Sequence, residues 1–113
     1  MAMVVRAFPL VARKEQLREF VASLLGARQA EADSFYHAYG VAHESWHLQE
    51  TPGGPWVIVC TELAEVPVAS ARYAASSHSF DTWFKAQVRA LTGIDLDQQP
   101  LGPPTESVFE WSR

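Results

Sequence analysis

The chain has 113 residues, a length that fits one domain. Apolar residues make up 48% of the sequence and charged residues 19%, as in ordinary globular proteins, and no apolar run approaches the roughly 20 residues that span a bilayer. The formal net charge is -4 and the nine Lys and Arg residues are scattered. We therefore expect neither membrane insertion nor nucleic-acid binding, because the latter needs a basic face.

The N-terminal residues show no charged stretch followed by a long apolar one, so we expect no signal peptide. The single cysteine, Cys60, has no partner for an internal disulfide. That cysteine content suits a reducing compartment, and we expect a cytoplasmic protein.

The first half of the chain predicts a strand and then a helix. Residues 3–10 form a short, valine-rich apolar run, which favours a strand that ends near Pro9. A helical stripe follows, and a weaker one continues to Tyr39; its first members are Leu17, Phe20, Val21, Leu24 and Leu25. We predict one long helix over residues 12–39, with Gly26 as an interruption or kink and Gly40 as its cap.

Two strands, residues 42–50 and 56–63, flank a strong turn sequence at residues 52–55, Pro-Gly-Gly-Pro. The second strand is apolar on both faces, which is typical of a central strand. Alternation divides the first strand into two faces. One face carries His43, Ser45, His47 and Gln49, and the other carries Ala42, Glu44, Trp46, Leu48 and Glu50.

The last third predicts two helices and a strand. Pro67 suits the first turn of a helix that runs to about Ser76. Ser79 is expected to cap a second helix that ends at Gly93, with a stripe of Phe80, Trp83, Phe84, Val88 and Leu91. Residues 95–104 are rich in Pro, Gly and Asp, which predicts an irregular loop, and residues 107–111 predict a closing strand.

The element order is therefore βαββαβ, a ferredoxin-like α+β domain with a four-stranded antiparallel sheet and helices on one face. The first hairpin strand and the C-terminal strand are expected at the sheet edges. The uncovered face would carry apolar residues, including Phe109 or Trp111. Because an exposed apolar face of that size usually marks an interface, we expect a homodimer that packs sheet against sheet.

The run RAFPL, the hairpin ESWHLQETPGGPWVIV, and FDTWF with LTGIDL further on give the chain a resemblance to the dimeric α+β barrel proteins, and within them to a small bacterial family of unknown function. Proteins with that barrel include cofactor-free monooxygenases acting on polyketide-like aromatics, haem-degrading enzymes and stress-responsive proteins. The resemblance thus implies a fold and a dimer. It leaves the activity open, because one fold hosts many functions.

Residues 43–47, HESWH, fit the HExxH pattern of zinc proteases, which places two imidazoles on one helical turn. Here the neighbouring sequence predicts a strand, where residues four apart are separated by roughly 13 Å. Two imidazoles at that separation cannot share one zinc ion, so we expect no metal site.

Two hypotheses remain for the hairpin and its surroundings. In the first, the protein binds a small aromatic or apolar molecule, or oxidises it without a cofactor. Its proton-transfer groups would be His43 and His47, its hydrogen-bonding group Gln49, and its pocket walls Trp46 and Trp83. In the second, the protein is a non-catalytic stress-responsive or interaction protein, in which the same residues lie on the surface, pack the core or fill the dimer contact.

No cofactor is expected. A haem would need an axial ligand that faces a large cavity, and spacing distinguishes none of His37, His43, His47 and His78. The sequence shows no phosphate-binding glycine loop and no dinucleotide fingerprint, because Gly53 and Gly54 belong to a turn between strands.

Overall fold

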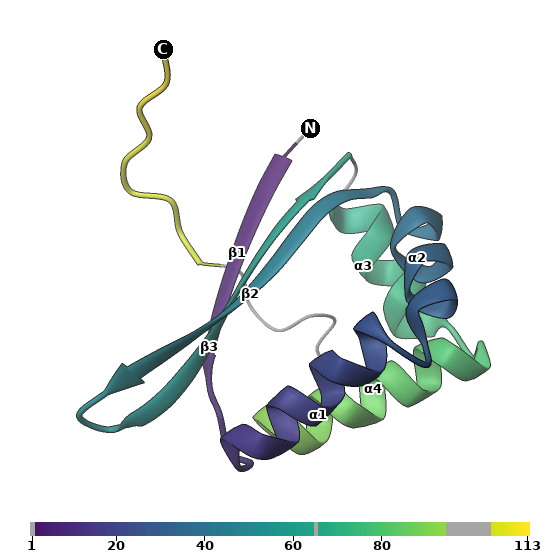
Figure 1. Cartoon of the computed structure of the whole chain (residues 1–113). Helices are drawn as coiled ribbons and strands as arrows, with labels where there is room; N and C mark the ends of the chain where they lie inside the picture. The colour runs from purple at the N-terminus through teal and green to yellow at the C-terminus, as the bar shows by residue number, and fades with distance from the viewer. Residues whose placement is uncertain (1, 65, 95–104) are drawn as a thin grey trace.

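The computed structural model describes residues 2–64, 66–94 and 105–113. Its elements, in chain order, are β1 (Ala2–Pro9), α1 (Lys14–Leu25), α2 (Gln29–Ala38), β2 (Val41–Thr51), β3 (Gly54–Leu63), α3 (Val66–Ala75) and α4 (Ser79–Thr92). The strands form an antiparallel sheet in the order β1-β3-β2, and the helices lie on one side of it (Figure 1). The predicted α+β class is confirmed, as are the central position of β3 and the edge position of β2.

The predicted long helix is two helices. Gly26 ends α1 with φ -119° and ψ -106°, outside the helical region, and α2 begins three residues later at Gln29. Figure 1 shows α2 turning steeply away from α1. The break lets Phe20 of α1 and Phe35 of α2 both reach the core, where they are 3% and 9% exposed. The expected kink at Gly26 is thus a full interruption.

The hairpin turn is held by one threonine. The hydroxyl of Thr51 accepts a hydrogen bond from the amide of Gly53 (3.1 Å) and donates one to the carbonyl of Gly54 (2.7 Å). Gly54 has φ +115°, a conformation that side chains other than glycine rarely adopt. The turn is therefore tighter than predicted, and β3 already begins at Gly54.

A β-bulge corrects the predicted alternation of β2. Val41 pairs with Leu63 and His43 pairs with Glu62, which leaves Ala42 as the extra residue on β2. From His43 onward the alternation holds. Glu44, Trp46 and Leu48 share one face, as predicted, and the structure shows that this face is turned toward the helices.

The two C-terminal helices lie where they were predicted, with one correction. The N-cap of α4 is His78 rather than Ser79, because the ring nitrogen Nδ1 of His78 accepts a hydrogen bond from the amide of Phe80 (3.3 Å). At the other end Gly93 adopts the left-handed conformation, with φ 76°. The predicted glycine cap is confirmed.

The predicted strand over residues 107–111 is not formed, so the described residues contain three strands rather than four. The amide of Thr105 donates a hydrogen bond of 2.7 Å to the carbonyl of Val5 in β1, and the following residues leave the body of the molecule (Figure 1). The predicted loop over 95–104 lies outside the described residues.

The core fills the space between the sheet and the helices, and aromatic rings dominate it. Phe84 of α4 lies near its centre, with ring centroids 4.8 Å from Phe35 and 5.4 Å from Phe20. Phe80 and Val57 are almost fully buried in the same cluster. The helical stripe predicted for α4 is therefore a core stripe. None of the helices in the described part of the chain is long and apolar enough to cross a membrane.

The other face of the sheet is open among the described residues. It carries alternate residues of β1 and β3, which pair across the ladder: Met3 with Glu62, Val5 with Cys60, Ala7 with Ile58, and Pro9 with Trp56. Met3 is 60% exposed and Trp56 is 37% exposed. We call this set, together with His43, Ser45, His47 and Gln49 of β2, the open face.

Candidate functional site: an apolar pocket with a carboxylate

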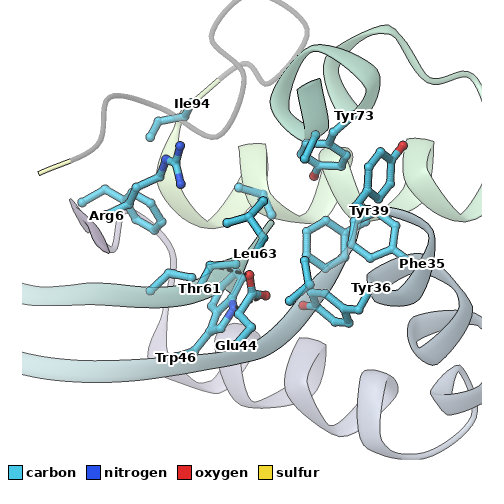
Figure 2. Close-up of a pocket in the computed structure, with 16 residues that line it drawn as sticks. Arg6, Phe35, Tyr36, Tyr39, Glu44, Trp46, Thr61, Leu63, Tyr73 and Ile94 are labelled. Atoms are coloured by element: carbon cyan, nitrogen blue, oxygen red, sulfur yellow. Dashed lines mark hydrogen bonds between the residues drawn. The ribbon is translucent and has the colours of Figure 1, made fainter. Parts of the chain in front are cut away.

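A pocket with a cavity volume of about 80 Å³ lies between the sheet and helices α2, α3 and α4 (Figure 2). On the sheet side it is lined by residues of all three strands, including Val59, Thr61 and Leu63 of β3. On the helix side it is lined mainly by aromatic rings, those of Phe35, Tyr36, Tyr39, Tyr73 and Phe84. Most of its wall is therefore apolar.

The pocket has room for more than a single water molecule, because one water needs roughly 10–15 Å³ of such space and the cavity has about 80 Å³.

Glu44 of β2 is the acidic group in the pocket wall. Its Oε1 atom accepts a hydrogen bond from the hydroxyl of Thr61 (2.8 Å), and its Oε2 atom accepts one from the indole Nε1 of Trp46 (3.0 Å). Strand pairing explains both contacts. Thr61 stands directly opposite Glu44 on β3, and Trp46 is the next residue of β2 on the same face. The carboxylate is thus held in place by side chains of two strands.

Tyr36 of α2 reaches the same carboxylate from the helix side. The pKa of Tyr36 is raised far above its usual value of 10.0. Burial is the main cause, and the charge of Glu44 adds to it. The phenol therefore stays protonated beside the carboxylate.

Arg6 of β1 provides the opposite charge. It is 7% exposed, and burial lowers its pKa while the charge of Glu44 acts in the other direction. Arg6 pairs with Val59 across β3, whereas Glu44 pairs with Thr61 from the other side. A guanidinium and a carboxylate thus flank the central strand on the face that lines the pocket (Figure 2).

A second polar contact, between Tyr39 and Asp81, lies beside the pocket. Tyr39 lines the pocket, whereas the charged residue, Asp81, does not. The hydroxyl of Tyr39 donates a hydrogen bond of 2.5 Å to Oδ2 of Asp81, which is 6% exposed. Burial, and after it this hydrogen bond, raises the pKa of Tyr39. Because Tyr39 follows α2 and Asp81 lies in the first turn of α4, the contact ties these helices together.

The candidate site residues that the sequence analysis proposed on β2 do not all lie on the same face of the sheet. Trp46 lines the pocket. His47 and Gln49 are exposed on the open face, where Nε2 of His47 lies 2.9 Å from the hydroxyl of Ser45. His43 is also exposed, beside a separate groove between β2 and helices α1 and α2 that Glu44 and Trp46 share.

Trp83 lies outside the pocket wall. Its ring packs between Phe20 and Phe80, at centroid distances of 5.6 and 5.5 Å, and the guanidinium of Arg28 lies 4.2 Å from its centre. The interpretation of Trp83 as a core residue accounts for these contacts. The structure therefore brings Trp46, but neither histidine, to the pocket between the sheet and the helices.

The HExxH segment lies in a strand, as the sequence predicted. Residues 43–47 belong to β2, and both histidines are exposed on its outer face. Within the described ranges, no three His, Cys, Asp or Glu side chains are grouped closely enough to hold a metal ion.

Sequence reasoning did not select Arg6, Thr61 and Tyr36. Arg6 had a usable signal, because it stands between Val4 and Phe8 at the spacing of one strand face, and a charge in that position indicates a buried polar contact. Thr61 and Tyr36 had no such signal. Their role depends on Glu44, which lies on a different element from either of them.

These features define a small α+β domain with an aromatic-lined pocket between its sheet and its helices, and a carboxylate fixed in the pocket wall. Comparisons of the chain with protein-family models, with curated proteins and with solved structures found no match.

Proposed function

We propose that the protein binds a small aromatic or apolar molecule in this pocket. The observation that carries the proposal is the combination of an aromatic wall with one fixed carboxylate, Glu44. Binding sites for small molecules are typically concave and apolar, with a few placed polar groups that orient the ligand. The pocket has that composition.

Oxidation of the bound molecule without a cofactor is the activity that the resemblance to dimeric α+β barrel monooxygenases suggests. Glu44 is then the group placed to accept a proton from the substrate, since a carboxylate in contact with a ligand acts as a general base. His43 and His47 stay candidates for proton transfer at the groove and the open face, and Gln49 for hydrogen bonding there. Oxygen consumption with single-ring aromatic substrates tests this activity.

The binding proposal is tested by titrating single-ring aromatic compounds while recording NMR chemical shifts. We expect saturable shifts for pocket residues such as Val59 and Ala69, and their loss in Ala69→Leu, which fills the space. The matched control is Ala7→Leu, an identical change on the open face. Shifts that persist in Ala69→Leu, or that are confined to the open face, would contradict the proposal.

The alternative function is a non-catalytic stress-responsive or interaction protein. The observation that favours it is the dense ring packing around Phe84, which gives most aromatic residues a structural role. In that case the titration gives no saturable shifts.

We also propose that the chain forms a homodimer through its open faces, in the manner of a ferredoxin-like α+β barrel, in the cytoplasm. The apolar residues of β1 and β3 on the open face support it, as do the exposed side chains of the tail, Val108, Phe109 and Trp111 (76–87% exposed). In a twofold dimer the same patch of both copies forms the interface, so one apolar face on each chain is sufficient.

Sedimentation of the full chain tests the dimer. We expect Ile58→Glu on the open face to shift the species to a monomer, and Val68→Glu on α3, where the side chain is 51% exposed, to leave the dimer intact. A wild-type chain that stays monomeric at high concentration would overturn the homodimer.

A further inference from the structure

The groove between β2 and helices α1 and α2 runs along the outer edge of the sheet. It has a cavity volume of about 400 Å³. Residues from both faces of β2 line it, Glu44 and Trp46 from the inner face and His43 from the open face. The groove therefore follows the edge of the strand rather than one of its faces.

That edge can take a further strand. In the described ranges β2 pairs with β3 on one side only, so every second residue of β2 turns its N–H and C=O groups away from β3. The strand carries neither lysine nor proline, two residues that commonly protect a sheet edge. After the bulge at Ala42 the pairing with β3 is regular from His43 to Thr51. This part of the edge is therefore straight enough to pair with an added strand.

The helices supply an apolar wall beside the edge. α1 contributes Val21, Leu24 and Leu25, and Leu25 is 70% exposed. α2 adds Ala32 and the ring of Tyr36. Proteins that bind an extended peptide at a sheet edge hold its backbone by main-chain hydrogen bonds and take alternate side chains into a neighbouring surface. The groove has both parts of that arrangement.

The charges of the groove indicate which side chains such a peptide carries. The acidic residues of the groove are Asp33 and Glu44, and no lysine or arginine among the described residues lines it. Both oxygens of Glu44 already accept hydrogen bonds, from Thr61 and Trp46. Asp33 is exposed and forms no ion pair within the described part of the chain. A lysine or arginine of the peptide therefore meets an acceptor at Asp33.

We propose that the edge of β2 and this groove bind an extended peptide, which adds to the sheet as a strand and carries a basic side chain between two apolar ones on the face toward the groove. The inference does not rest on the proposed small-molecule function, because the groove is a second site. The two sites share part of a wall, whereas Leu25, Ala32 and Asp33 line the groove and not the pocket.

A capped peptide, Thr-Val-Thr-Lys-Thr-Val-Thr, provides the probe, because alternation places its valines and its lysine on one face. We expect this lysine peptide to give saturable NMR shifts in the full chain, at amides of β2 and at Leu25, Ala32 and Asp33. A peptide with glutamate in place of the lysine should bind about tenfold more weakly, since an attraction to the groove becomes a repulsion.

N-methylated peptides test the pairing with the edge of β2. The amides of an extended chain point alternately to its two sides, so methyl groups on the second, fourth and sixth residues block one side, and those on the third and fifth block the other. A peptide that adds to a sheet edge pairs through one side only. We expect one of the two methylated peptides to lose binding, and the other to bind within about threefold of the lysine peptide.

Asp33→Asn removes the charge and keeps the size of the side chain. We expect this variant to bind the lysine peptide about fivefold more weakly and the glutamate peptide no more weakly than the wild type does. The control is Glu31→Gln, exposed on the same helix and outside the groove, which should leave both affinities unchanged. The comparison of the peptides on the wild-type chain does not depend on how well a variant folds.

Several results would overturn the proposal. They are the absence of saturable binding, shifts confined to the open face or to β1, equal binding of the lysine and glutamate peptides, and equal binding of both methylated peptides. Concentration-dependent shifts of the β2 amides without peptide would assign the edge to a second copy of the chain instead. None of these results bears on the titration with aromatic compounds, whose readouts, Val59 and Ala69, lie outside the groove.

Discussion

The hydroxyl of Thr61 donates a hydrogen bond of 2.8 Å to the carboxylate of Glu44, its direct neighbour across the ladder of β2 and β3. This contact fixes a carboxylate on the inner face of the sheet, where most of the other side chains are apolar. It links the stability of the domain to the geometry of the pocket, because the same carboxylate would meet a ligand.

Thr61→Val keeps the shape of the side chain and removes the donor. We expect the free energy of unfolding to fall by about 1–2 kcal/mol, since Glu44 loses a hydrogen bond in a half-buried position. Urea denaturation measures it. Thr82→Val, an identical change at an exposed position of α4, is the control and should stay within about 0.5 kcal/mol of wild type. Equal losses in the two variants would mean that the contact contributes little.

Phe84→Ala removes the ring at the centre of the core. Phe84 is 4% exposed and packs against rings from α1 and α2, so we expect a loss of about 3–5 kcal/mol. Phe109→Ala changes a ring that is 81% exposed, and we expect about 0.5 kcal/mol or less in the monomeric chain. Thermal and urea unfolding give both values, and a loss below 1 kcal/mol for Phe84→Ala would contradict this packing.

The stability of the chain should fall in alkaline solution because of Tyr36. Burial, and after it the charge of Glu44, raises the pKa of this phenol in the folded state above its unfolded value of 10.0. Below that pH both states keep the proton, so the phenol adds no pH dependence. Above it only the unfolded state releases the proton, and the free energy of unfolding decreases by up to about 1.4 kcal/mol per pH unit.

Urea denaturation of the wild type and of Tyr36→Phe between pH 9 and 11.5 measures this slope. The free energy of unfolding of Tyr36→Phe should decline less steeply above pH 10. Part of the decline that persists in this variant is due to Tyr39, whose pKa is also raised. Parallel curves for the two proteins would refute the role of Tyr36.

Gly93→Ala should destabilise the end of α4. Gly93 has φ 76°, and a side chain in that conformation costs about 1 kcal/mol. Gly53→Ala is the matched control, because its φ is not in the left-handed range and an added Cβ has its nearest neighbour at 3.8 Å. A difference in melting temperature between the two variants measures the effect, and equal melting temperatures would count against the strained cap.

We expect that the HExxH segment does not bind zinc in the way that a catalytic zinc site does. Its histidines are four residues apart on a strand, a separation of roughly 13 Å, whereas zinc holds each nitrogen at about 2.0–2.1 Å. Metal analysis of the purified protein checks this. Stoichiometric zinc that is lost in His43→Ala would show that the strand rearranges around a metal.

The local patterns of the sequence determined most of the elements and the faces of β2 and α4. The period of two in β2 placed Glu44 and Trp46 together and opposite His43, and the helical stripe of α4 placed Phe84 in the core. Gly40 and Gly93 were predictable as helix ends, because their positive φ is a property of glycine itself. These features depend on neighbours a few residues away.

What only the tertiary structure decided is the pocket, since its residues come from six elements. Arg6, Tyr36 and Thr61 acquire a role only because β1, α2 and β3 converge on Glu44. The interruption after α1 and the unpaired tail have the same origin. How far a helix or strand continues depends on what it packs or pairs against, and a local pattern of side chains does not contain that information.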